Sequence, residues 1–150
     1  MLNVSDNSLG ETGSEAIAEA LRENKVMKNL NMSKNNGGAK CAKIMADGVI
    51  TNGALTDLNV SNNSIGQMVL PEGWTFNPSV PAYRQYTHTD GRQQEVPPEG
   101  SKPEGVIALA DAIKNNGALS SLNLSQNAIP AETMGPIEAL CHSRQIVLHK

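Results

Sequence analysis

The sequence predicts one domain of the α/β class, a right-handed α/β solenoid with a parallel sheet inside and helices outside. Two observations predict it. The pattern apolar-Asn-apolar-Ser-x-Asn occurs four times, and its first three copies are evenly spaced, with starts at positions 2, 30 and 58. Apolar segments with helical spacing follow it at residues 16–21 and 106–113. Recurrence at a fixed period of this size is typical of chains built from stacked strand–helix segments.

Each copy of the pattern predicts a short strand, because alternating apolar and polar side chains place one face in a core. We expect parallel strands near residues 2–4, 30–32, 58–60 and 122–124, with a short fifth near 146–148. Helices are expected at about 14–23, 40–51, 104–115 and 132–142. Capping boxes at Thr12-x-x-Glu15 and Ser101-x-x-Glu104 favour two helix starts, and Asn52-Gly53 and Asn116-Gly117 favour two ends at residues that tolerate a positive φ.

The strand pattern, the period and the helix positions together resemble the leucine-rich repeat, specifically the 28-residue type of the ribonuclease-inhibitor-like group. The resemblance covers about 114 of the 150 residues. It implies a horseshoe whose concave sheet face meets protein partners. Gly37 and Pro130 depart from the residues at the matching positions of the other copies, so the second and fourth segments are expected to be looser.

The asparagine that ends each copy has a predicted structural role. These residues are Asn7, Asn35, Asn63 and Asn127. The backbone turns after each strand and leaves amide groups without partners in the sheet, and an asparagine side chain offers both donors and an acceptor. We therefore expect a buried ladder of asparagine side chains.

The fourth copy starts at position 122 and not at position 86, where the regular spacing would place it. This delay predicts an insertion at residues 67–102 on the rim of the horseshoe. Every Phe, Tyr and Trp of the chain lies in it. Residues 86–96 predict a hairpin with a type I′ turn at Asp90-Gly91. The aromatic side chains either anchor the insertion or form an exposed binding surface; we expect Trp74 to be buried and residues 83–88 to be displayed.

The composition argues against several functional classes. The net charge is −3, with no basic stripe for nucleic acid and no apolar run of about 18 residues for a membrane. Cys41 and Cys141 are expected to be reduced core residues, and the histidines lack ligand spacing. No nucleophile–base arrangement or phosphate-binding loop is found. The sequence therefore predicts a cytoplasmic protein that is not an enzyme and has no metal or cofactor.

The predicted function is a protein–protein interaction module. On the concave face the expected binding residues are Asn29, Lys34, Asp57, Asn62, Ser121 and Gln126, which vary between the copies. In the insertion they are Trp74, Phe76, Tyr83, Arg84, Tyr86 and His88, because aromatic residues and arginine dominate binding hot spots. The identity of the protein partner is not predicted.

Two alternatives stay open. One is a GTPase-activating type of regulator on the same fold, with Arg84 and Arg92 as the candidate loop arginines. The other is a self-assembling scaffold, because Met1 directly precedes the first strand and leaves an uncapped N-terminal edge that could pair with another copy.

Overall fold

The computed structural model describes residues 1–77, 79–80 and 85–150, and the chain divides into two compact units. Unit 1 comprises Met1–Gln67 and Pro103–Lys150, and unit 2 comprises Met68–Lys102. The predicted insertion, residues 67–102, differs from unit 2 by one residue. The assignment of both units to a single domain stays a prediction.

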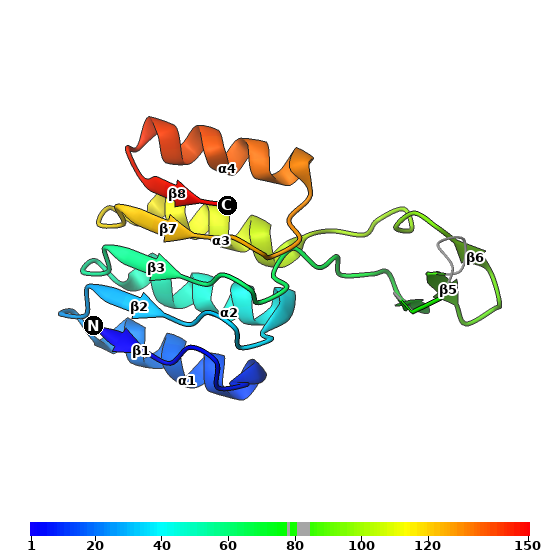
Figure 1. Ribbon diagram of the computed structural model, residues 1–150, viewed down its shortest axis with the longest axis horizontal. Helices are drawn as coiled ribbons and strands as arrows, with labels where there is room; N and C mark the ends of the chain where they lie inside the picture. Colours follow the sequence, from blue (N-terminus) through cyan, green and yellow to red (C-terminus); the bar gives the residue numbers. More distant parts are fainter. Residues whose placement is uncertain (78, 81–84) are drawn as a thin grey trace. The chain divides into compact units, whose positions relative to one another are not determined.

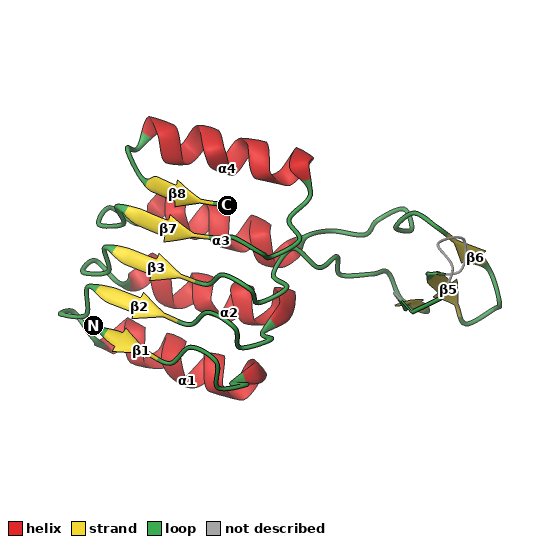
Figure 2. Ribbon diagram, viewed as in Figure 1, coloured by secondary structure: helices red, strands yellow, loops and turns green. Residues whose placement is uncertain are grey.

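Unit 1 contains a five-stranded parallel sheet in the order β1-β2-β3-β7-β8 (Figures 1 and 2). The strands are β1 (Leu2–Asn3), β2 (Asn29–Asn31), β3 (Asp57–Asn59), β7 (Ser121–Asn123) and β8 (Val147–His149). One leucine of each strand, at positions 2, 30, 58, 122 and 148, shares the same row of the sheet. The strand motif therefore predicted the pairing, and each observed bound lies within one residue of the expected one.

Four helices follow the first four strands of this sheet. They are α1 (Gly10–Glu23), α2 (Gly38–Thr51), α3 (Glu104–Asn115) and α4 (Ala131–Ser143). Figure 1 shows α1, α2 and α3 behind the strands, on one side of the sheet. Leu30, Leu58 and Leu122 are at most 2% exposed and belong to the same buried core as the apolar residues of these helices. The core thus lies between the sheet and the helices.

The structure corrects the predicted fold class. The chain has a small α/β fold with a five-stranded parallel sheet and a separate three-stranded antiparallel sheet, so the right-handed α/β solenoid or leucine-rich repeat horseshoe is wrong as its description. The regular spacing of the motif specifies which strands pair and in which register. A strand–helix–strand crossover is common to parallel α/β sheets in general, so the spacing alone does not determine the higher-order class.

Helix α3 has the predicted bounds, α1 and α2 end at the predicted residues, and α4 differs by one residue at each end, so the clear departures are the starts of α1 and α2. Helix α1 begins four residues before the expected start, after Leu9, and Pro103 precedes α3, so neither predicted capping box is present. At the C-terminal ends, Asn52 and Asn116 have φ of −90° and −83° rather than positive values. Their side chains, and not a left-handed backbone, satisfy the groups at the ends of the helices.

The predicted asparagine ladder follows the strands, and Asn63 shows how it works. Its Nδ2 donates to the carbonyl oxygens of Met32 and Val60 at 2.8 and 3.1 Å. Its Oδ1 accepts from the backbone N–H groups of Asn35 and Gly37 at 2.9 and 3.4 Å. Asn35 and Asn127 bond in the same way, and all three are buried. Each side chain therefore joins two neighbouring strand–helix segments. The prediction is wrong for Asn7, which is exposed and donates to the carbonyl oxygen of Ser5 in its own turn.

A second row of side chains joins the helix ends, and sequence analysis did not predict it. Asn52 donates to the carbonyl oxygens of Leu21 and Asn24, and Asn116 donates to those of Val49 and Asn52. Each Oδ1 accepts two backbone N–H groups of the loop that follows. Arg144, which occupies the matching position of the last segment, donates to the carbonyl oxygens of Ile113, Lys114 and Asn116. A guanidinium thus takes the place of the amide there.

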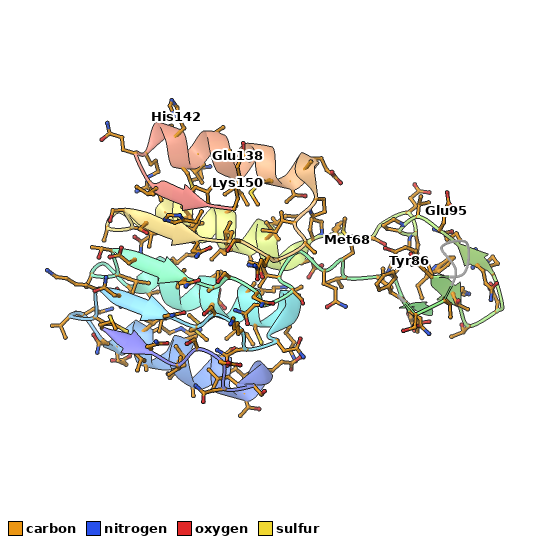
Figure 3. All side chains as sticks on the ribbon, viewed as in Figure 1. Met68, Tyr86, Glu95, Glu138, His142 and Lys150 are labelled. Atoms are coloured by element: carbon orange, nitrogen blue, oxygen red, sulfur yellow. The ribbon has the colours of Figure 1, made fainter. Side chains whose placement is uncertain are left out.

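The expected looseness of the second and fourth segments is met only in part. Helix α2 buries seven residues, and close approaches of Gly48 to Ala18 and of Gly105 to Ala39 join it to α1 and α3. Helix α4 buries only Ile137 and Cys141 and contains Pro136, which has no N–H to donate to the helix. An ion pair between Glu138 and Lys150, 2.6 Å apart, links α4 to the C-terminal residues (Figure 3).

Unit 2 forms a three-stranded antiparallel sheet of β4 (Trp74–Phe76), β5 (Tyr86–His88) and β6 (Gln93–Gln94). Strands β5 and β6 form the predicted hairpin, whereas β4 was not predicted. The type I′ turn is wrong: Gly91 has a φ of 94°, Asp90 does not have a positive φ, and Gly91 N–H bonds the carbonyl of His88. This pattern is typical of a three-residue hairpin loop that ends in a left-handed glycine.

We predict that Asn63→Ala lowers the free energy of unfolding by about 1–3 kcal/mol, because it leaves buried backbone groups without partners. Ser33, the serine of the second copy of the strand motif, is buried and is therefore a poor control. Ser61→Ala is the better control, because this residue is half-buried and its hydroxyl makes no hydrogen bond among the described residues. Urea titration of both variants checks the prediction, and equal losses would contradict the role of the ladder.

The packing of α2 against α3 gives a second prediction. A Cβ at Gly105 would lie 2.5 Å from the carbonyl oxygen of Ala39, whereas one at Gly117 meets nothing within 4 Å. We expect Gly105→Ala to destabilise the protein by about 1–3 kcal/mol through overpacking. Gly117→Ala should stabilise it by about 0.4–1 kcal/mol, because its backbone suits alanine and the unfolded chain loses freedom. Thermal unfolding of the two variants measures the contrast, and shifts of the same sign would refute it.

Candidate functional site

The face of the parallel sheet opposite the helices carries polar side chains. The residues on either side of each buried leucine point to this face, since side chains alternate along a strand. A groove of about 260 Å³ lies on it. Its lining includes Asn3, Asn29, Asn31, Asp57, Asn59 and Ser121, and also Asn123 and His149. We call this feature the sheet groove.

Four asparagines, Asn3, Asn31, Asn59 and Asn123, form a row along the sheet groove. Each Oδ1 accepts a hydrogen bond of 3.0 Å from the backbone N–H of the serine two residues later. This bond fixes which end of each amide is the acceptor. No protein group among the described residues accepts from the four Nδ2 groups. The row therefore offers donors at the strand spacing of about 4.8 Å.

Asp57 lies on the same face and is half-buried. Its Oδ2 accepts a hydrogen bond of 2.7 Å from Asn29 Nδ2, and the hydroxyl of Thr56 lies 2.7 Å from the same oxygen. In the register of the sheet, Asp57 stands between Asn29 and Ser121. The structure thus brings together three of the residues predicted for the concave face.

The other three predicted residues of that face are not part of the groove. Lys34, Asn62 and Gln126 are exposed in the turns after the strands, with φ of 58°, 54° and 57°. Left-handed backbone suits asparagine but is unfavourable for lysine and glutamine. The positions that differ between copies of the motif therefore include exposed turn residues as well as residues of the groove.

In unit 2, one face of the small sheet carries the aromatic residues. Trp74 pairs with His88 and Phe76 with Tyr86 across β4 and β5, with ring centroids 5.2 and 4.9 Å apart. Trp74, which was expected to be buried, is only half-buried, Tyr86 and His88, which were expected to be displayed, are half-buried as well, and Phe76 is 42% exposed. The predicted residues Tyr83 and Arg84 lie outside the described residues.

A charged cluster surrounds Trp74 in unit 2. The guanidinium of Arg92 lies over the indole, 5.6 Å from its centroid, and Arg92 Nε donates to Asp90 Oδ2 at 2.8 Å. The backbone N–H of Arg92 bonds the other oxygen, and together with bonds from His88 and the guanidinium it lowers the pKa of Asp90 to about 2. His88 Nδ1 lies 2.9 Å from Asp90 Oδ1. Both oxygens of this carboxylate are therefore occupied within the unit.

The described residues contain no group of three His, Cys, Asp or Glu side chains able to hold a metal ion. Cys41 and Cys141 are buried free thiols, and burial raises the pKa of each. Within the described part of the chain, no helix is long and apolar enough to cross a membrane. A scan against protein-family models gives no match, and a search of curated proteins gives none either.

The lowered pKa of Asp90 predicts a transition in unit 2 at acidic pH. Because this pKa lies below the value of 3.8 for a free side chain, the stabilisation by Asp90 is fully present above pH 3.8 and is lost as the pH falls towards 2. Fluorescence of Trp74, the only tryptophan, should report the loss of the Arg92 contact over this range. Asp90→Asn is the matched control and should lack the transition. An unchanged acid titration in this variant would contradict the role of Asp90.

Proposed function

We propose that the chain is a protein-binding module and that the sheet groove is its binding surface. The observation that carries the proposal is the row of four asparagine amides with unused donors beside a half-buried carboxylate. Peptide carbonyl groups are the matching acceptors. An extended polypeptide segment is therefore the class of ligand that suits the groove.

The architecture of unit 1 supports this proposal. Parallel sheets are usually covered on both faces. In unit 1, all of which is described, the helices pack on one face and polar side chains line the other. The resemblance of the strand motif to leucine-rich repeats of the ribonuclease-inhibitor-like group stays a prediction; it also favours binding of proteins at this face.

The two alternative functions have less support. A GTPase-activating role needs an arginine that can reach a partner, but Arg92 contacts Asp90 and Trp74, and Arg84 lies outside the described residues. Self-assembly through the edge strand β1 stays a prediction. The aromatic face of unit 2 stays a second candidate surface for the same class of partner.

Selection of random peptides by phage display against the immobilised full chain tests the proposal. We expect peptides that bind wild type, lose at least tenfold in affinity on Ser121→Trp, and keep their affinity for Glu15→Gln. Ser121→Trp places a large ring in the groove, whereas Glu15 is exposed on α1. Thermal unfolding confirms that both variants are folded. Failure to select any peptide, or equal binding to Ser121→Trp, would refute a binding role for the groove.

A further inference from the structure

We propose that the sheet groove recognises a basic side chain, arginine or lysine, of an extended polypeptide, and that Asp57 is the residue that binds it. This inference rests on the proposed function and goes further, because it names the chemistry of the partner. Three features of the groove carry it: the hydrogen bonds of Asp57, the charges around it, and the adjacent row of amides.

Hydrogen-bonding neighbours hold the carboxylate of Asp57 in place, but they contact only one of its two oxygens. Asn29 Nδ2 and the Thr56 hydroxyl both lie 2.7 Å from Oδ2. No protein group among the described residues bonds Oδ1 or forms an ion pair with Asp57. One oxygen is therefore free to accept from a ligand. Because its two neighbours already fix the carboxylate, little side-chain freedom is lost when a ligand binds.

The charges of the groove favour a cation. Asp57 is the only carboxylate among the lining residues, and no lysine or arginine side chain lines the groove. Among the other lining residues, only His149, through its side chain, and Met1, through its amino group, can carry a charge. A charge-assisted hydrogen bond from a guanidinium or ammonium group is stronger than one between neutral groups. An anionic ligand would instead face the carboxylate of Asp57, which has no ion-pair partner among the described residues.

The asparagine row supplies contacts that a free cation could not use. Asn59 belongs to the same strand as Asp57, two residues further on, and pairs in the sheet with Asn31 and Asn123. Their Nδ2 groups can donate to peptide carbonyl oxygens next to the basic residue. The groove thus combines donors for a backbone with one acceptor for a positive side chain, and a basic polypeptide segment satisfies both.

Synthetic nonapeptide libraries with a fixed central residue test the inference on the full chain. The central residue is arginine, lysine, glutamate or citrulline, which has the shape of arginine without its charge. Wild type should bind the arginine and lysine libraries at least tenfold more tightly than the citrulline library and bind the glutamate library most weakly. The preference for arginine should decrease as the salt concentration increases, since Asp57 is only half-buried and salt screens its attraction to the arginine of the peptide.

The variant Asp57→Asn should bind the arginine and citrulline libraries with equal affinity. Ser121→Lys is a second variant, because Ser121 pairs with Asp57 in the sheet and a lysine there can occupy the carboxylate. It should abolish the preference for arginine as well, and it decides the question if Asp57→Asn does not fold.

The outcomes separate the two proposals. If wild type binds the arginine and citrulline libraries equally, and Ser121→Trp weakens both, then the groove binds peptides but the basic preference is wrong. If the preference persists in Asp57→Asn or Ser121→Lys, Asp57 is not the recognition residue. If wild type binds none of the libraries, both the inference and the proposed function are overturned.

Discussion

Unit 1 depends on side chains that satisfy the backbone of the neighbouring segment. At the strand ends, Asn35, Asn63 and Asn127 each donate to carbonyl groups and accept from N–H groups that the sheet leaves unpaired. At the helix ends, Asn52 and Asn116 do the same. A buried polar group without a partner costs free energy. Each segment must therefore place its asparagine beside the same backbone groups of the preceding segment, which fixes how neighbouring strands line up.

This constraint also shapes the candidate site. Because the turns on both sides of each strand are held by buried bonds, the residues beside each leucine occupy fixed positions on the open face. Asn29, Asp57 and Ser121 therefore come together although they belong to three different strand–helix segments of the chain. A ligand for the groove would meet a surface that is already ordered, which lowers the entropic cost of binding.

The sequence predicted strand pairing well, because leucine and asparagine recur at fixed distances. It predicted the start of α3 but not those of α1 and α2, since Gly10 and Gly38 begin these two helices without a side-chain cap. It also missed His149 as a groove residue, because β8 lacks the strand motif and pairs with β7 out of step with the period of the other strands. The predicted fold class was wrong because the regular spacing of the motif specifies which strands pair but does not by itself determine the architecture of the whole fold. In unit 2, β4 follows a turn signal at Pro71-Glu72-Gly73 but is only three residues long, too short for apolar–polar alternation to identify it.

Two aspartates show why the groove, rather than the charged cluster of unit 2, is the stronger candidate for binding. Both carboxylate oxygens of Asp90 accept hydrogen bonds within its own hairpin, and these bonds lower its pKa. Its partner Arg92 is likewise engaged with Trp74. Among the described residues, Asp57 has two neighbours on one oxygen and none on the other. A carboxylate that is positioned but incompletely bonded has capacity left for a ligand, whereas the cluster around Asp90 already stabilises its own hairpin.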